Sequence, residues 1–187
     1  MGNKVIFLDR DGVICKEKSY VTKLEQLEIF DYAAKAVRVF HILGYAVIVI
    51  TNQSGIARGM FSEDELVKMN SKIYKEVKVD DILYCPHLPP KQGEKEREPY
   101  IIKCTCRKPN TGLIEQAVRK HDLTLNGAFF VGDRASDIET GQNAHIKTVL
   151  LESGYGSTRL EKDITPDYIF NDLMEFAEFL QEKGNAI

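Results

Sequence analysis

Short apolar runs alternate with helical stretches along most of this chain. Runs of four or five largely apolar residues that end at polar turns are typical of strands buried on both faces of a parallel sheet. These runs occupy residues 5–8, 46–50, 81–84, 128–131 and 148–151. Between them, apolar residues recur every three or four positions, which predicts helices over about residues 33–43, 62–77, 113–118 and 173–180, with a further short helix after residue 133.

This alternation of strands and helices predicts an α/β protein. Right-handed crossovers between parallel strands place helices on both faces of a sheet. We therefore expect a Rossmann-like three-layer α/β/α sandwich with a mainly parallel sheet of about five strands. A length of 187 residues, of which 43% are hydrophobic, suits one core, so residues 1–187 are expected to form a single domain.

Charge and composition narrow the choice of partners and compartment. The formal net charge is -3 and the pI is about 5.9, with acids and bases well mixed, so no nucleic-acid partner is expected. No run approaches the roughly 20 apolar residues of a membrane span, and the first residues do not resemble a signal peptide. We expect a cytoplasmic protein with reduced cysteines, no membrane partner and, in the absence of an assembly motif, a monomeric state.

A proline-rich loop over residues 86–109 is too long to be structureless inside a compact domain, so something must hold it. Three sulfur ligands and one imidazole bracket this loop, and they are the complement of a closed tetrahedral zinc site. The predicted ligands of this structural Zn²⁺, in a zinc-binding loop over about residues 85–106, are Cys85, His87, Cys104 and Cys106. The alternative is a surface histidine with incidental thiols. The fourth cysteine, Cys15, is expected to be a packed small residue.

Polar groups follow three of the predicted strands. Asp9 and Asp11 come directly after the first strand, Thr51 follows the second, and Asp133 follows the fourth. Carboxylates that converge at one sheet edge repel one another without a cation, and Mg²⁺ prefers oxygen ligands. The Thr51 hydroxyl, the backbone amides after it and the Lys108 ammonium would then bind phosphoryl oxygens. Taken singly, each of these segments also fits an ordinary surface turn.

Four ordered motifs resemble those of the haloacid dehalogenase (HAD) superfamily. They are DRDGV at residues 9–13, ITNQSG at 50–55, CRKP at 106–109 and GDRASD at 132–137, and together they span most of the chain. The resemblance implies a Mg²⁺-dependent phosphatase. Asp9 would attack phosphorus and form an aspartyl-phosphate, while Asp11 would protonate the leaving oxygen and later deprotonate the hydrolytic water.

The same resemblance implies which groups bind the phosphoryl group and the metal ion. Thr51 and Lys108 would hold the transferring phosphoryl group, with Asp137 as a supporting acid. The implied Mg²⁺ ligands are the Asp9 carboxylate, the Asp11 backbone carbonyl and Asp133. The intervals after Asp11 and Thr51 are too short for a separate cap domain, so loops would shape the site and leave it open to solvent.

The cysteine–histidine loop, ITNQSGIARG at residues 50–59 and CRKP resemble more narrowly the D-glycero-D-manno-heptose 1,7-bisphosphate phosphatases. The implied partner is a small phosphorylated sugar that loses its 7-phosphate. By this resemblance, Arg107 and the loop after Thr51 contact substrate, and Arg107 suits a second, remote phosphate. The residues assigned to phosphate or substrate binding are Thr51, Asn52, Gln53, Arg58, Arg107, Lys108 and Arg134. Arg134 stands where this family often has lysine, which leaves the preferred anomer open.

Three other functions stay open. The related histidinol-phosphate phosphatases share the phosphatase chemistry. A nucleic-acid 3′-phosphatase is another alternative, because enzymes without a cap can admit large substrates. From a different class, the chain could be a non-catalytic binding module that uses the zinc loop on a retired phosphatase scaffold. The presence of every implied catalytic residue argues against that last alternative.

Overall fold

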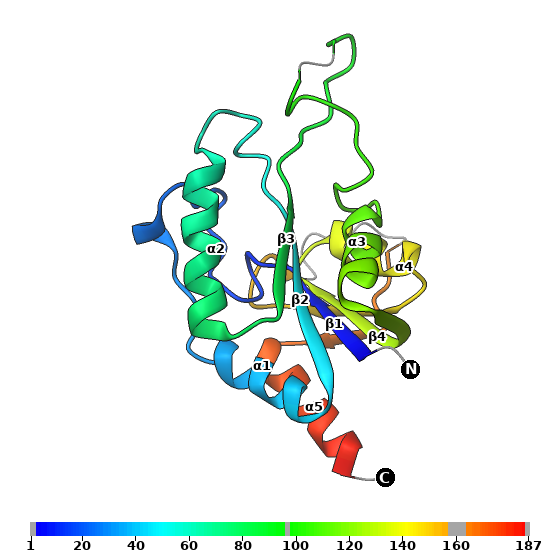
Figure 1. Ribbon diagram of the computed structural model, residues 1–187. Helices are drawn as coiled ribbons and strands as arrows, with labels where there is room; N and C mark the ends of the chain where they lie inside the picture. Colours follow the sequence, from blue (N-terminus) through cyan, green and yellow to red (C-terminus); the bar gives the residue numbers. More distant parts are fainter. Residues whose placement is uncertain (1–2, 96–97, 157–163, 186–187) are drawn as a thin grey trace.

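The computed structural model describes residues 3–95, 98–156 and 164–185, and these form a sheet between two layers of helices (Figure 1). Six strands, all parallel to their neighbours, follow the order β3-β2-β1-β4-β5-β6. The strands are β1 (Asn3–Leu8), β2 (Tyr45–Asn52), β3 (Asp81–Cys85), β4 (Leu123–Gly132), β5 (Lys147–Leu151) and β6 (Tyr168–Phe170). The predicted Rossmann-like α/β/α sandwich is confirmed.

The count of about five strands is one too low. The additional strand, β6, adds three residues to the sheet edge by pairing with β5. Its three residues are apolar, but this run is shorter than the runs of four or five by which the buried strands are recognised, and the middle residue, Ile169, is 53% exposed.

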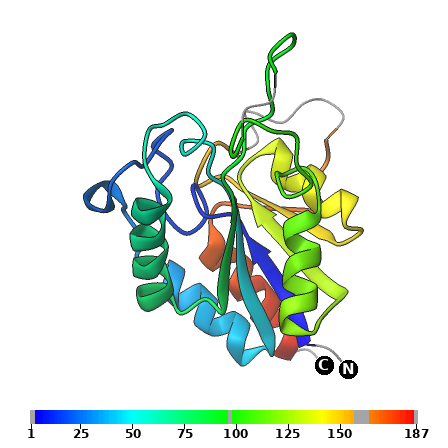
Figure 2. The ribbon, with the colours of Figure 1, turned by 45° about the horizontal axis from the view of Figure 1, so that its top comes forward.

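The helices divide between the two faces of the sheet (Figures 1 and 2). One face is covered by α1 (Ala33–Ile42), α2 (Glu63–Val77) and α5 (Leu173–Asn185), and the other by α3 (Gly112–His121) and α4 (Ala135–Asn143). Side chains of β1 alternate accordingly. Ile6 and Leu8 pack in the core beneath α1, α2 and α5, whereas Val5 and Phe7 pack in the core beneath α3. No helix of the described segments is long and apolar enough to cross a membrane.

A capping residue begins α2. The Ser62 hydroxyl accepts a hydrogen bond from the Glu65 N–H at 3.2 Å and caps α2, whose first turn also carries three acidic residues.

Between β1 and α1 the chain forms loops with one short 3-10 turn, η1 (Leu24–Gln26). No domain is inserted there or after β2, in agreement with the absence of a cap expected from the sequence.

The strand order creates a switch point beside β1. The chain runs from β1 to β2 and β3 on one side and then returns to add β4, β5 and β6 on the other. Leu8, the last residue of β1, is in register with both Val49 of β2 and Val131 of β4. β4 therefore ends one residue beyond β1, and β2 ends three residues beyond it. Crevices at such points, beyond the carboxyl ends of the strands, are where ligands bind in open α/β sheets.

Candidate active site

Asp9 lies where β1 ends, between the ends of β2 and β4. Its backbone N–H donates to the Val131 carbonyl at 2.9 Å, which extends the pairing of β1 with β4 by one residue. The side-chain Oδ1 accepts a hydrogen bond from the Arg10 N–H at 2.7 Å and lies 2.8 Å from Lys108 Nζ. These contacts hold a buried carboxylate at the switch point.

Three carboxylates meet at this place. One oxygen each from Asp9, Asp133 and Asp137 lies within 4.8 Å of the others, and all three side chains are buried. Asp133 Oδ2 accepts a hydrogen bond from the Tyr155 N–H at 2.8 Å. Asp133 Oδ1 is buried with no hydrogen-bond partner among the described residues, and Arg134 Nε lies 3.8 Å from it. An unsatisfied buried oxygen beside two further carboxylates suits a hard divalent cation such as Mg²⁺.

Glycines on two sides allow the chain to pack closely around Asp133. A Cβ atom added at Gly154 would lie 2.0 Å from Asp133 Oδ2, and one at Gly12 would lie 2.3 Å from the same oxygen. Gly12 also has a φ of +85°, a conformation that favours glycine. The backbone on both sides therefore confines the Asp133 carboxylate to one position.

Lys108 supplies the positive charge of the acid cluster. Its Nζ lies 2.8 Å from Asp9 Oδ1 and 2.7 Å from Asp137 Oδ1, and the side chain is buried. The Asn52 side-chain amide donates to the Lys108 carbonyl at 3.2 Å and accepts from the Lys108 N–H at 3.1 Å. Asn52, which the sequence assigned to substrate binding, thus fixes the backbone that carries Lys108.

One lysine does not neutralise these acids. Burial raises the pKa of Asp9 to about 6, although the nearby Lys108 ammonium opposes the rise. Burial, together with the negative charges of Asp9 and Asp137, raises the pKa of Asp133 to about 8. Charge within the cluster is therefore incompletely compensated, and a bound cation would favour the ionised carboxylates.

The Asp11 carboxylate lines the same pocket as Asp9, as expected, but it is not one of the three carboxylates of this cluster. Asp137 supplies the third carboxylate instead. The Asp11 side chain pairs with the Arg10 guanidinium at 2.8 Å, and Gln53 Nε2 donates to Asp11 Oδ2 at 3.0 Å. Burial alone would raise the pKa of Asp11, but the Arg10 guanidinium outweighs it and the pKa is lowered. The metal contact assigned to the Asp11 backbone carbonyl stays a prediction.

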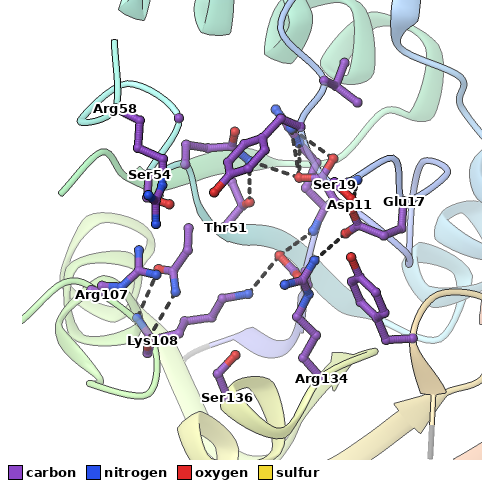
Figure 3. A pocket seen from close by; sticks show the side chains of 18 of the residues that line it. Asp11, Glu17, Ser19, Thr51, Ser54, Arg58, Arg107, Lys108, Arg134 and Ser136 are labelled. Atoms are coloured by element: carbon purple, nitrogen blue, oxygen red, sulfur yellow. Dashed lines mark hydrogen bonds and ion pairs between the residues drawn. The ribbon is translucent and has the colours of Figure 1, made fainter. Parts of the chain in front are cut away.

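A pocket of about 320 Å³ opens in front of these residues (Figure 3). Asp9 and Asp11 line it together with Thr51, whose Oγ1 accepts a hydrogen bond from Gln53 Nε2 at 2.9 Å. Four arginines and Lys108 also line it. The structure thus brings together every residue that the sequence assigned to phosphate or substrate binding. These are Thr51, Asn52, Gln53, Arg58, Arg107, Lys108 and Arg134.

The four soft ligands predicted for zinc also meet. One atom each from Cys85, His87, Cys104 and Cys106 lies within 4.8 Å of the others. Cys85 Sγ is 3.2 Å from Cys106 Sγ and 3.7 Å from Cys104 Sγ, and His87 Nδ1 is 3.2 Å from Cys106 Sγ. This is a possible metal-binding group at the base of the loop that extends beyond the sheet in Figure 1.

The loop is also tied to the body of the protein by side chains. Glu63, the first residue of α2, accepts hydrogen bonds from the hydroxyls of Tyr84 at 2.6 Å and Tyr100 at 2.7 Å. The Arg107 guanidinium donates to the His87 carbonyl at 3.1 Å. The candidate metal group and these bonds therefore position the segment that leads into Lys108.

Comparison with known proteins decides the family. A HAD-hydrolase-like family model matches residues 105–176. A D-glycero-alpha-D-manno-heptose-1,7-bisphosphate 7-phosphatase of Campylobacter jejuni is 37% identical over 98% of this chain and 99% of its own. A D-glycero-beta-D-manno-heptose-1,7-bisphosphate 7-phosphatase of Haemophilus ducreyi is 34% identical over 96% of this chain and 100% of its own. The chain belongs to the heptose-bisphosphate phosphatase family of HAD-like hydrolases.

A solved structure from the same family supports the comparison. The D,D-heptose 1,7-bisphosphate phosphatase of B. bronchiseptica, complexed with magnesium and phosphate, has a TM-score of 0.83 and 29% identity. The match covers 96% of this chain and 99% of that one. The chain is thus a phosphatase, and its relatives include proteins named for each anomer of the heptose.

Glu17 is a pocket residue that the sequence did not reveal. It pairs with Arg134 Nη2 although the two residues are 117 positions apart, and the Arg134 guanidinium carbon lies 4.3 Å from the centre of the Tyr155 ring. Figure 3 shows Glu17 and Arg134 on one side of the pocket, and Arg58 and Arg107 on the other. Glu17 belongs to no motif of the chain, so only the fold connects it with the family's phosphatase pocket.

Proposed function

We propose that this protein is a Mg²⁺-dependent phosphatase that removes the 7-phosphate from D-glycero-D-manno-heptose 1,7-bisphosphate. The observation that carries this proposal is the position of the acid cluster. Asp9 and Lys108 lie in the floor of a pocket whose outer walls carry three arginines, and the buried Asp133 and Asp137 lie beside them without lining it. The chain also matches heptose-bisphosphate 7-phosphatases over nearly its full length.

Asp9 is the proposed nucleophile. Its carboxylate oxygen forms a bond to phosphorus while the bond from phosphorus to the C7 oxygen breaks, and the leaving oxygen takes a proton from Asp11. Lys108 and Thr51 hold the oxygens of the phosphoryl group during this transfer. Bound to Asp9, Asp133 and the Asp11 carbonyl, Mg²⁺ would supply positive charge against the phosphoryl oxygens.

Hydrolysis of the aspartyl-phosphate completes the proposed reaction. Asp11, now a carboxylate, takes a proton from a water molecule as the water oxygen bonds to phosphorus. The bond from phosphorus to Asp9 then breaks, which releases inorganic phosphate and restores both aspartates. The carboxylate form of Asp11 is the one that its pairing with Arg10 favours.

The arginines of the pocket walls are the proposed receptors for the 1-phosphate. Arg107 and Arg58 line the pocket with Lys108, and arginine binds phosphate through two parallel hydrogen bonds. Arg134, held against Glu17 and Tyr155, is proposed to contact the sugar from the opposite side. A bisphosphate would then place one phosphate at Asp9 and the other at the rim.

The four soft ligands are proposed to bind a structural Zn²⁺. Two sulfurs on a tetrahedral zinc ion, each about 2.3 Å from it, lie roughly 3.8 Å apart, close to the separation of Cys85 and Cys104. Four protein ligands leave no position for water, which favours a role in holding the loop. Thiol ligands of this kind fit the predicted cytoplasmic location. That residues 1–187 act as one monomeric domain also stays a prediction.

A substrate panel tests the proposed function. It compares kcat/KM for both anomers of the heptose 1,7-bisphosphate, for histidinol phosphate and for a 3′-phosphorylated oligonucleotide, with Mg²⁺ present. We expect one heptose anomer to be hydrolysed best. Preference for histidinol phosphate or the oligonucleotide would replace the proposed substrate, and no hydrolysis of any of the four would favour a binding module.

A further inference from the structure

Arg10 is the largest fully buried side chain of the described residues, and in the proposed reaction it only favours the carboxylate form of Asp11. It lies between Asp9 and Asp11 in the turn after β1, with 1% of its surface exposed, and it lines the pocket. Burial of a guanidinium costs several kcal/mol unless it is well paired. An apolar residue would fill the same space without that cost, so the charge calls for an explanation.

The pairing of Arg10 is directed at one group. Nε donates to Asp11 Oδ2 at 3.1 Å, and Nη2 donates to Asp11 Oδ1 at 2.9 Å and to Oδ2 at 2.8 Å. This fork sets the plane of the carboxylate as well as its distance, which a lysine ammonium could not do.

Gln53 holds the same carboxylate from a different loop. Its Nε2 donates to Asp11 Oδ2 at 3.0 Å and to Thr51 Oγ1 at 2.9 Å. A chain of hydrogen bonds therefore runs from Arg10 through Asp11 and Gln53 to Thr51, as the dashed lines of Figure 3 show in part. It connects the proposed acid and base with a proposed phosphate-binding hydroxyl.

We propose that Arg10, assisted by Gln53, is a positioning residue that orients the Asp11 carboxyl group toward the leaving oxygen. The inference rests on the proposed function, because it requires Asp11 to move protons. A structural ion pair would need only one contact between charges. The three bonds from Arg10 and the further bond from Gln53 instead fix the orientation of a group that lines the pocket.

The orientation of Asp11 should matter for phosphoryl transfer only when the leaving group needs a proton, whereas it should matter for hydrolysis of the aspartyl-phosphate with every substrate. When the ester bond breaks, the electron pair stays on the leaving oxygen, and an alkoxide needs the proton of Asp11 to depart. A p-nitrophenolate leaves without it. Loss of orientation should therefore slow phosphoryl transfer from a sugar phosphate and spare transfer from p-nitrophenyl phosphate.

The test uses Arg10→Lys, Gln53→Ala and, as a matched control, Arg119→Gln on the exposed face of α3. For Arg10→Lys, kcat/KM for the heptose bisphosphate should fall about a hundredfold, the lower range for loss of acid catalysis. For p-nitrophenyl phosphate, kcat/KM should change little, while kcat should fall because hydrolysis of the aspartyl-phosphate still needs Asp11 as a base. Gln53→Ala should lower kcat/KM for both esters, because Gln53 also holds Thr51, and should lower it more for the heptose bisphosphate than for p-nitrophenyl phosphate. Arg119→Gln should match the parent.

The inference would be overturned if Arg10→Lys lost kcat/KM equally on the two substrates, or if it kept the parent kcat/KM on both. Either result would assign Arg10 a structural role. If Arg10→Lys does not fold, as judged by circular dichroism and thermal unfolding, Gln53→Ala decides on the same split. The parent protein separates this failure from that of the proposed function. A parent that hydrolyses neither ester refutes the function itself, whereas an active parent with unsplit variants refutes only the role of Arg10.

Discussion

The floor and the walls of the pocket are built in opposite ways. In the floor, Asp9 and Lys108 are buried, as is Asp133 beside them. Asp9 and Asp133 directly follow strands, Asn52 holds the backbone of Lys108, and Gly12 and Gly154 confine Asp133. In the walls, Arg58, Arg107 and Arg134 come from loops, and Arg134 keeps 41% of its side chain exposed. The difference indicates that the sheet sets the reaction chemistry and the loops set the choice of substrate.

The largest expected effect comes from the floor. Asp9→Asn should keep the fold, because asparagine fills the same space, and should lower kcat by roughly 10⁴-fold or more, as loss of a nucleophile does in other enzymes. Circular dichroism and phosphate release measure the two outcomes. If Asp9→Asn turned over at the parent rate, Asp9 would have no part in the reaction, and the floor would no longer differ from the walls in carrying the chemistry.

Loss of the proposed zinc tests whether the two regions are coupled. Lys108 follows Cys106 by two residues, so release of the loop should displace the ammonium from Asp9 and lower activity about ten- to hundredfold. Zinc would be removed with a chelator, Mg²⁺ restored and phosphate release measured, with readdition of Zn²⁺ as the control. Undiminished turnover in the zinc-free protein would show that the loop is not needed to position Lys108 in the floor.

A change in one wall should affect substrate binding alone. Arg107→Gln removes a charged donor worth about 1.5–3 kcal/mol, which raises KM for the bisphosphate roughly ten- to hundredfold. Heptose 7-phosphate, which lacks the 1-phosphate, is the control substrate, and its KM should not change. If both substrates lost affinity equally, Arg107 would act by holding the His87 carbonyl rather than by binding phosphate.

A comparison of alanine variants at two glycines with positive φ distinguishes the cost of backbone strain from the cost of crowding in the floor. Gly44→Ala meets open space and should cost only the strain of about 1–2 kcal/mol. Gly12→Ala adds a contact with Asp133 and should cost a further 1–3 kcal/mol or so of overpacking. Urea unfolding measures both, and Gly12→Ala alone should weaken Mg²⁺ binding. Equal losses of stability would mean that Asp133 is free to move aside.

The smallest effect concerns pH. Folding raises the carboxyl pKa from 3.8 to about 6 for Asp9 and to about 8 for Asp133, so the metal-free fold binds protons more tightly than the unfolded chain. This contribution to stability is present at low pH and is lost as pH rises through that range. Mg²⁺ competes with the same protons, so its stabilising effect on Tm should grow between about pH 5 and 8. A Tm shift independent of pH would contradict the shared site, and Asp133→Asn should flatten the dependence.

The aspartates of the floor were predictable because strand ends fix their positions, whereas Lys108 was found only through the family motif. The runs before Asp9, Thr51 and Asp133 revealed those ends, and parallel pairing brings them together. The sequence did not show that Arg10 would turn inward and pair with the neighbouring Asp11 carboxylate.

The walls were less predictable because loops approach one another only in the folded chain. Asn52 lines the pocket, but the sequence did not show that its amide would bind the backbone of Lys108, 56 residues away. The contact of Glu17 with Arg134 likewise spans 117 positions without any periodic pattern. Motifs identified which groups are present, whereas the partners of each group depended on tertiary packing.

A rapid-quench experiment tests the central claim, which is that Asp9 carries the phosphoryl group. The enzyme is mixed with heptose bisphosphate labelled in the 7-phosphate and with Mg²⁺, quenched in acid within one turnover, and digested. The account predicts that protein-bound label rises and decays during turnover, is released by hydroxylamine, and lies in the peptide that contains Asp9. Phosphate release without any protein-bound label, or label on another residue, would contradict it.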